Sequence, residues 1–340
     1  MVEPVRPKNS SYDIAAWIIA AVALLMVLRL HLLPALLSGL LVYELVHILA
    51  PLILIRRTSG NRAKLVAVAL LAVAIVASLV FLIWVAVHFF RSGAESLPAL
   101  LKKMAEIIEG SRENLPQWVA DYLPGDAEEF KNRVAGWLHA HAGEVEVVGK
   151  EAGRAAAHIL VGLVIGALVS LREAAPTHKY RPLAAALAGQ AARLSRAFRS
   201  VVFAQVRISA LNTIFAWLYL GVLLPLLGVH LPLVKTMIAI TFVVGLIPVV
   251  GNLVSNSIIT VVSLSHSPAV AFGSLLFLVI IHKLEYFLNA RIIGSRISAH
   301  AWELLLAMLV MEAAFGIPGV VAAPVYYAYV KDELVDRGLV

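Results

Sequence analysis

The sequence predicts an all-α, polytopic membrane protein with about eight transmembrane helices. Of its 340 residues, 61% are hydrophobic and only 14% are charged, whereas about a quarter of the residues are charged in a soluble domain. Apolar runs of roughly 17–25 residues also recur along the chain, and a helix of that length spans the hydrocarbon core of a bilayer. Composition and run length therefore indicate the same fold class.

Composition also excludes several kinds of site. Cysteine is absent, so disulfides, thiolate metal sites and a cysteine nucleophile are excluded. The net charge of +7 does not indicate nucleic-acid binding, because the basic residues gather beside apolar runs, where they orient a membrane protein and contact anionic lipid. A phosphate-binding Gly-Lys-Ser/Thr loop and the motifs of intramembrane enzymes are also missing from the sequence. We therefore expect no enzyme activity, no cofactor and no metal.

Eight apolar runs follow one another along the chain. The expected spans are 15–33, 35–55, 65–90, 155–171, 201–227, 231–264, 269–288 and 304–330. Pro34 separates the first two as a tight hairpin. An amphipathic elbow helix within 172–200 is expected on the cytoplasmic side, because Arg193, Arg196 and Arg199 recur on one face, where they suit anionic headgroups.

Lysine and arginine counts beside these runs predict the orientation of the chain. Basic clusters at 56–64 and 172–207 place both segments in the cytoplasm, and the insert at 92–154 between them outside it. Residues 1–91 then form an N-terminal three-helix region, and residues 155–340 form a C-terminal transport region. Apolar residues recur at helical spacing in the insert, which predicts amphipathic helices. Both termini are expected in the cytoplasm.

The sixth run contains a motif that breaks a helix. Pro248 lies between Gly245 and Gly251 in apolar sequence, and Asn252 and Asn256 follow. Proline removes a backbone donor and clashes with the preceding turn, and glycine permits further unwinding. Carbonyl groups freed in this way, together with the asparagine amides, are suited to bind a polar solute or a cation. The alternative is a proline kink that only shapes helix packing.

The same motif leaves two topologies open for the last third of the chain. The break near Pro248 either bends one long span across 231–264 or turns the chain back as a re-entrant hairpin. The count of eight spans favours the single kinked span, which is our working prediction. The basic residues Arg291 and Arg296 favour the hairpin instead.

Ionisable residues at membrane depth form a second group of candidates. His282, Glu285 and Asn289 share one helical face, at i, i+3 and i+7, and Arg291 follows them. Glu312 lies well inside the last run. A charged side chain at the bilayer centre costs about 2.5–3.5 kcal/mol or more, so such residues usually mark a solute or proton pathway. The alternatives are an interfacial loop for the first group and an assembly ion pair for the last.

Glu44 and His47 lie in the middle of the second run, three residues apart. A Glu-x-x-His pair is half of a carboxylate-bridged metal site. A full site needs a second such pair, and only the reversed His282-x-x-Glu285 is present. We therefore expect Glu44 and His47 to form a hydrogen-bonded pair inside the bundle.

Three segments carry a family resemblance. They read Gly-Leu-Ile-Pro-Val-Val-Gly at 245–251, Lys-Leu-Glu to Asn-Ala-Arg-Ile-Ile-Gly at 283–294, and Phe-Gly-Ile-Pro-Gly to Pro at 315–324. With the first hairpin, the third span, the helical insert and the dense C-terminal half, the chain resembles the autoinducer-2 exporter family, also called the PerM-like permeases, over nearly its whole length. It departs from the family at Ala290 and at 300–303, where proline is usual.

The resemblance implies a secondary transporter of the bacterial inner membrane that exports a small polar metabolite or signal. Other members behave as sodium (or lithium)/proton antiporters, which is one alternative, and a scaffolding membrane protein is the alternative of another class. The expected partners are the lipid bilayer, a small polar solute or monovalent cation, and further copies of the chain in a homo-oligomer, with a pentamer as the candidate form; nucleic acid is not expected. The expected pathway residues are Pro248, Gly251, Asn252, Asn256, His282, Glu285, Asn289, Arg291 and Glu312.

Overall fold

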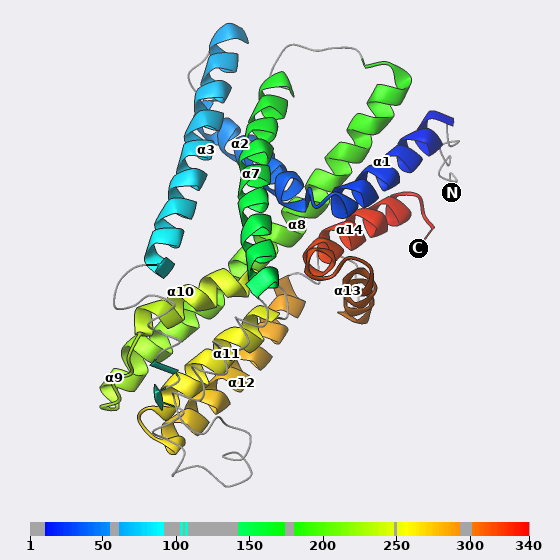
Figure 1. The fold of residues 1–340 in the computed structure, drawn as a ribbon. Coiled ribbons are helices and arrows are strands. Elements are labelled where there is room, and N and C mark those ends of the chain that lie inside the picture. The colour runs from blue at the N-terminus through cyan, green and yellow to red at the C-terminus, as the bar shows by residue number, and fades with distance from the viewer. Residues whose placement is uncertain are drawn as a thin grey trace. The chain divides into compact units, whose positions relative to one another are not determined.

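The computed structural model describes residues 11–54, 61–91, 103–104, 106–107, 142–173, 180–247, 250–292 and 301–339. The regular elements among these residues are all helical (Figure 1). Within them, five helices contain stretches long and apolar enough to cross a membrane, and three shorter apolar helices lie between residues 234 and 283. The predicted class, an all-helical polytopic membrane protein, is confirmed. Most of the insert at 92–154 lies outside the described residues.

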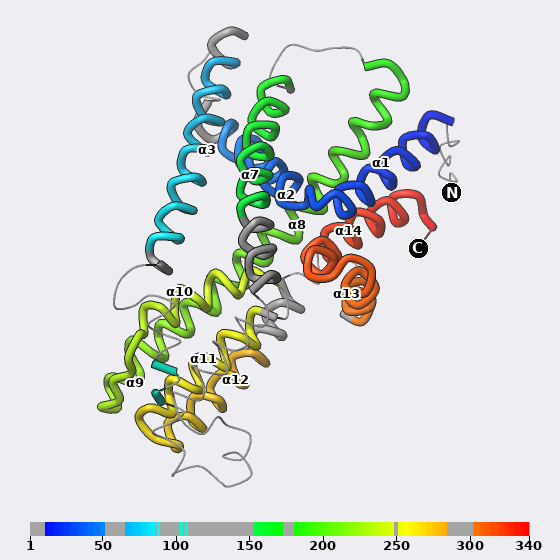
Figure 2. Tube along the Cα trace, in the orientation of Figure 1, coloured from blue at the N-terminus to red at the C-terminus, as the bar shows by residue number. Residues whose placement is uncertain are grey.

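The chain forms two compact units, which are described separately below. The first comprises the described residues of 1–82, 149–203 and 297–340, and the second those of 83–148 and 204–296. Figure 2 traces the chain through both units. Because the second unit interrupts the first in sequence, each unit is built from segments that are far apart along the chain.

Among the described residues, seven helices contribute to the first unit. They are α1 (Ser11–Arg29), α2 (Leu33–Leu54), α3 (Asn61–Arg91), α7 (Ala142–Glu173), α8 (Pro182–Leu218), α13 (Ala301–Phe315) and α14 (Ile317–Asp336). Helices α1 and α2 are joined by a short turn in which His31 has a positive φ of 56°. Pro34 belongs to the first turn of α2, where a missing amide hydrogen costs nothing. The two helices diverge from this turn (Figure 1), so the expected tight hairpin is a tight turn without side-by-side packing.

Helices α2 and α7 cross at a contact made by glycine. A Cβ atom on Gly162 would overlap with the backbone of Ala35, and one on Gly166 would overlap with the backbone of Gly39. An apolar cluster from α2, α3 and α7 surrounds this crossing. Small residues allow helix backbones to approach closely, which is a common way of packing helices within a bilayer.

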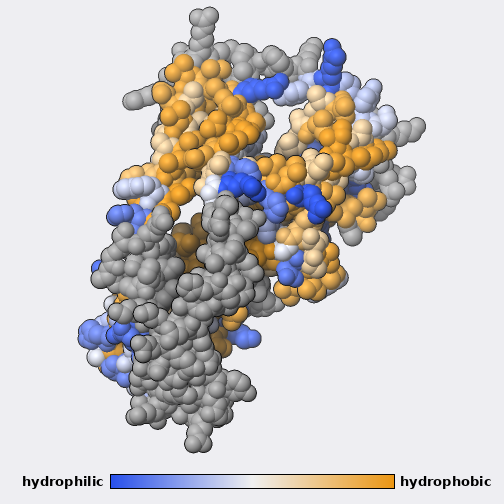
Figure 3. Space-filling view, viewed as in Figure 1, coloured by the Kyte–Doolittle hydropathy of each residue, from blue (hydrophilic) through white to orange (hydrophobic). Residues whose placement is uncertain are grey.

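The outer surface of α3 is apolar. Leu70, Val73 and Phe81 are each at least 60% exposed, and Figure 3 shows a continuous hydrophobic surface over this helix. Such a surface would be unfavourable in water, but it suits contact with lipid acyl chains.

Buried carboxylates of the first unit are held by arginine and by neutral donors. Glu44 of α2 accepts a 2.5 Å hydrogen bond from the Ser195 hydroxyl of α8, and its other oxygen lies 3.8 Å from Arg199 Nε. The ring of His47 contacts the carbonyl oxygen of Tyr43 at 2.8 Å. The predicted Glu44–His47 pair is therefore replaced by a contact between α2 and α8, because Glu44 points toward the neighbouring helix rather than along its own.

Glu333 joins three helices of the same unit. Its carboxylate lies 2.5 Å from Arg193 of α8 and 2.7 Å from Arg337. It also accepts a 2.8 Å hydrogen bond from the indole nitrogen of Trp17 in α1. Two cations and a neutral donor thus compensate one buried carboxylate at the C-terminal end of α14.

Helix α8 combines two elements that the sequence analysis treats separately. It runs from Pro182 to Leu218 and continues through the π-helical turn η2 (Tyr219–Leu223) into α9 (Leu224–Leu226). The amphipathic arginine-bearing segment and the predicted fifth span are therefore one continuous helix, because proline is absent between Pro182 and Pro225. Its C-terminal part, from residue 204, belongs to the second unit.

The second unit contains two successive helical hairpins. Helix α10 (Val234–Gly245) packs against α11 (Val250–Leu264), and α11 packs against α12 (Pro268–Ile292), as Figure 1 shows. With 12 and 15 residues, α10 and α11 are about 18 and 22 Å long, shorter than a bilayer core of about 30 Å. The working prediction of one kinked span across 231–264 is therefore wrong, and the hairpin alternative is the one observed.

Glycine permits this first hairpin. A Cβ atom on Gly251 would overlap with the carbonyl group of Val244, so α11 can begin against the end of α10 only with glycine at this position. Pro248 lies outside the described residues, between the two helices. The helix break predicted near it is confirmed, since α10 ends at Gly245 and α11 begins at Val250.

The predicted last span over 304–330 is also divided into two packed helices, α13 and α14. They meet at Gly316, whose φ of 63° and ψ of −146° are almost exclusive to glycine. A Cβ atom on Gly319 would overlap with the carbonyl oxygen of Met311, so α14 returns directly against α13. The single-span prediction is wrong here because the backbone at Gly316 turns the chain back.

Candidate functional site

A polar cleft in the second unit is the candidate functional site. Its enclosed part has a volume of about 20 Å³, and side chains from α8, α10, α11 and α12 line it. The polar lining residues are Asn212, Thr241, Asn252, Ser255, Asn256 and His282. The cleft therefore gathers amide, hydroxyl and imidazole groups within helices that are otherwise apolar.

Three of these side chains form a hydrogen-bonded row across the cleft. The amide nitrogen of Asn212 donates to Asn252 Oδ1 at 3.3 Å, and the amide nitrogen of Asn252 lies 3.4 Å from His282 Nδ1. The row connects α8, α11 and α12 through two amide groups and one imidazole.

The helix break positions this row without leaving bare carbonyl groups. The last four carbonyls of α10 have no intrahelical partner when a helix ends. Ser209 donates to the carbonyl of Phe242 at 2.6 Å, and Gln205 donates to that of Gly245 at 2.7 Å. The backbone amides of the turn serve the two carbonyls between them, at Val243 and Val244.

The hydrogen bonds at the end of α10 correct the prediction made for its carbonyl groups. From the sequence, the carbonyls freed at the break are expected to bind a solute or cation. Those at the end of α10 are instead bonded to protein donors, as buried backbone groups normally are. The groups that remain to face a solute are side-chain amides, hydroxyls and the imidazole of the cleft.

The structure brings part of the predicted site together. Asn252, Asn256 and His282 line the cleft, and Gly251 forms the contact that starts α11 beside it. Glu285, Asn289 and Arg291 continue along α12, which extends to Ile292. These three residues are therefore helical and do not form a loop, whereas the apolar part of the helix ends at Lys283. Their side chains lie outside the described part of the structure.

Glu312 belongs to a different part of the molecule. It is exposed on α13, in the first unit, whereas the cleft lies wholly within the second. The structure thus does not place Glu312 among the side chains that line the cleft.

Sequence reasoning missed Asn212, Thr241 and Ser255 as cleft residues. Each is a single polar residue within an apolar run, and such residues commonly bond to their own helix backbone. A signal was present nonetheless, because Gln205, Ser209 and Asn212 recur at i, i+4 and i+7 and therefore form a polar stripe on one face of α8.

The described side chains include no group of three or more His, Asp or Glu residues arranged to hold a metal ion. The cleft is instead suited to hydrogen bonding, since its polar groups are amides, hydroxyls and one imidazole from four different helices. This arrangement can bind and release a polar solute without forming or breaking covalent bonds.

A family model provides the deciding comparison. The model of the AI-2E family transporters matches residues 14–336, which includes the described helices of both units. The chain belongs to this family. Neither a curated protein nor a solved structure matches it. As an AI-2E family transporter, the protein is a multi-pass membrane transporter rather than an enzyme.

Proposed function

We propose that this AI-2E family transporter exports a small, neutral, polar metabolite through the cleft of the second unit. The observation that best supports this proposal is the row formed by Asn212, Asn252 and His282. Polar side chains inside apolar membrane helices are costly. A row that crosses from helix to helix and faces a cleft therefore has a function beyond packing.

The chemistry of the cleft indicates the solute class. Amide groups supply a donor and an acceptor on the same side chain, and hydroxyls do the same, so they match a solute that carries hydroxyl or carbonyl groups. The enclosed volume of about 20 Å³ is close to the space that one water molecule needs, so a larger solute enters only when the lining side chains move apart. A furanosyl signal such as autoinducer-2, which the family resemblance suggests, carries hydroxyl groups that match this chemistry.

The proposed pathway also includes residues outside the described lining. Pro248, Glu285, Asn289 and Arg291 adjoin the cleft in sequence, and His282 and Glu285 are the proposed proton carriers. Glu312 is retained as a proposed proton-exchanging residue on the evidence of its position in an apolar run. A proton gradient is the proposed driving force, since the sequence lacks a nucleotide-binding loop.

Sodium (or lithium)/proton antiport is the second candidate. Glu285 follows His282 by about one helical turn on α12. A carboxylate at that place would supply the negative charge that a desolvated cation needs. The two candidates therefore differ in the residue on which they depend: Asn252 for a neutral solute and Glu285 for a cation.

Flux in liposomes tests both candidates. Purified protein is reconstituted, and efflux of autoinducer-2, ribose and radioactive sodium is measured with and without a pH gradient. We expect movement of a neutral solute that Asn252→Ala slows at least about tenfold, the equivalent of one strong hydrogen bond. The matched control is Ser257→Ala on the same helix, whose hydroxyl bonds to its own helix at Leu253.

Other outcomes are equally informative. Sodium movement that Glu285→Gln abolishes and Asn252→Ala spares would establish the antiporter instead. If neither a neutral solute nor a cation moves, the transport proposal fails, and a scaffolding role is favoured.

Assembly and topology are proposed from the sequence. A homo-oligomer, with a pentamer as the candidate form, would appear in native mass spectrometry of the detergent-solubilised protein. The natural absence of cysteine allows single engineered cysteines to report sidedness in inner-membrane vesicles. A cysteine in the insert at 92–154 is expected to react from outside the cell, and one in the 56–64 segment from the cytoplasm.

A further inference from the structure

A chain of three buried hydroxyl groups lies in the core of the second unit. The Tyr219 hydroxyl is 2.9 Å from Ser274 Oγ, which is 2.7 Å from Ser263 Oγ. Tyr219 is 6% exposed, and both serines are fully buried. These residues come from η2, α12 and α11, the continuations of the same three helical segments that form the amide row of the cleft.

The hydroxyl chain lies further along the same three helical segments than the amide row of the cleft. Tyr219 follows Asn212 by about two helical turns, Ser263 follows Asn252 by about three, and Ser274 precedes His282 by about two. Since α11 and α12 are antiparallel neighbours, a step forward along α11 and a step backward along α12 lead from the amide row to the same side. The hydroxyl chain therefore lies on one side of the amide row along all three helices. The unit therefore contains two polar layers in succession along three helices.

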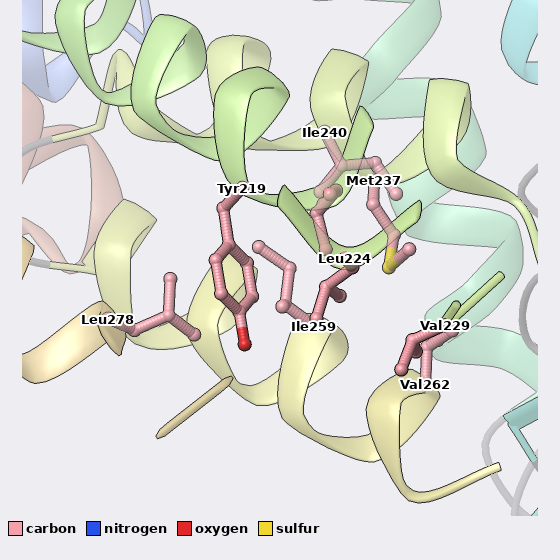
Figure 4. Packing of buried hydrophobic residues seen from close by; sticks show 9 residues of the cluster. Tyr219, Leu224, Val229, Met237, Ile240, Ile259, Val262 and Leu278 are labelled. Atoms are coloured by element: carbon pink, nitrogen blue, oxygen red, sulfur yellow. The ribbon is translucent and has the colours of Figure 1, made fainter. Parts of the chain in front are cut away.

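An apolar layer separates the two polar layers. Ile259, Phe277 and Leu278 are apolar lining residues of the cleft, and they also belong to, or pack on, the hydrophobic cluster that contains Tyr219. The ring of Phe277 stacks on that of Tyr219, with 4.0 Å between the ring centroids and 10° between the planes. Figure 4 shows Tyr219 between Leu278 on one side and Ile259 on the other.

Packing alone does not account for the hydroxyl chain. Burying a hydroxyl costs free energy that its hydrogen bonds only offset, and apolar residues of similar size fill a core without this cost. Three hydroxyls carry three protons and use two of them in bonds with one another. The chain thus has one further donor, together with oxygen lone pairs, to offer a polar partner.

The backbone at the same place has an unusual geometry. Tyr219 begins the π-helical turn, in which the amide of Leu224 bonds to the carbonyl of Tyr219. π-Helical turns are rare and occur frequently at functional sites. A change between π and α geometry rotates the residues of the turn, so η2 is a local element through which Tyr219, and Phe277 stacked on it, can move.

We propose that the hydroxyls of Tyr219, Ser263 and Ser274 form a second binding site for the transported solute, behind a gate made by Ile259, Phe277 and Leu278. The solute is neutral and hydroxyl-bearing, because three hydroxyls replace its water without supplying charge. This inference rests on the proposed function. In the closed state the hydroxyls bond to one another, and in the open state they bond to a solute that has passed the gate.

The second site is tested with autoinducer-2 as the probe, in reconstituted full-length protein. Tyr219→Phe removes one hydroxyl and keeps the ring stack, and Ser274→Ala removes the central hydroxyl. We expect both variants to slow efflux at least about tenfold and to leave the equilibrium Kd for the probe within about twofold, because the amide row is intact. Ser257→Ala is the control.

The gate is tested by the leak of glycerol into proteoliposomes. Phe277→Ala is expected to raise the protein-dependent leak at least about fivefold, since it removes the largest side chain of the apolar layer. The matched control is Phe272→Ala on the same helix, which removes a ring that is 70% exposed. An unchanged leak in Phe277→Ala would overturn the gate.

The outcomes distinguish the two proposals. If Asn252→Ala abolishes efflux but Tyr219→Phe and Ser274→Ala retain the unmodified rate, the second site is wrong and the proposed function stands. If Asn252→Ala and the unmodified protein do not differ, the proposed function fails, and the second site fails with it. A tenfold loss of efflux accompanied by an equal loss of binding would also contradict a separate site.

Discussion

The two units bury polar groups in different ways. In the first unit, Glu44 and Glu333 are each compensated by arginine on a neighbouring or adjacent segment. In the second unit, the cleft is lined by amides, hydroxyls and one imidazole. Breaking a buried ion pair costs about 3–5 kcal/mol, whereas a neutral hydrogen bond contributes about 1 kcal/mol. Ionic contacts thus suit a unit whose helices stay in one packing arrangement. Neutral hydrogen bonds suit a unit whose side chains exchange a protein partner for a solute.

The largest effect expected from this comparison is on the ion network of the first unit. Glu333→Ala removes the carboxylate that Arg193 and Arg337 share and leaves Arg193 with only its longer contact to Asp336, and we expect a loss of roughly 3 kcal/mol in the free energy of unfolding. Thermal unfolding of the two proteins in detergent measures this loss of stability. Asp332→Ala, an exposed acidic residue one position earlier, is the control. Equal stability of the two variants would show that the network contributes little.

The glycine crossing of the first unit gives the next effect. Gly166→Ala adds a methyl group where the backbone of Gly39 lies, and overpacking of this kind costs about 1–3 kcal/mol. The control is Gly153→Ala on the same helix, where the added methyl group meets nothing within 4 Å. We expect Gly153→Ala to be neutral or slightly stabilising, because alanine favours helix by about 1 kcal/mol over glycine. Similar melting temperatures for both variants would disprove the close approach.

A smaller effect is expected at the helix break of the second unit. Ser209→Ala removes the donor to the carbonyl of Phe242 and should cost about 1 kcal/mol. Hydrogen exchange of α10 and α11 would report this loss as faster local opening. Thr213→Ala is a suitable control, since that hydroxyl bonds to the carbonyl of Ser209 within its own helix. If exchange is unaltered in Ser209→Ala, the carbonyl has found another donor.

The smallest contrast concerns the acidic residues outside the described lining of the cleft. Glu285 continues the helix that carries His282, whereas Glu312 lies in the first unit. We expect Glu285→Gln to slow flux by about tenfold and Glu312→Gln by less than about threefold, corresponding to roughly 1.4 and 0.6 kcal/mol. Initial rates at several pH values provide the measurement. A Glu312→Gln variant with unaltered rate and pH dependence would remove Glu312 from the mechanism.

The limits of sequence reasoning are clearest at the helix break. Pro248, Gly245 and Gly251 predict an interruption, and the ends of α10 and α11 confirm it. They do not distinguish a kink from a hairpin, because both conformations need the same loss of helical hydrogen bonds. The contact of Gly251 with the carbonyl of Val244 decides between them, and that contact exists only once the two helices pack.

The sequence by itself determined the class of the protein, its family and the place where its sixth run breaks. These depend on composition, on run length and on local backbone chemistry, which are properties of short segments. Tertiary structure decided which polar residues meet: Asn212 joins Asn252 and His282, whereas Glu44 bonds to Ser195 rather than to His47. A side chain's partner depends on which helix faces it, and helix packing over the whole unit determines that.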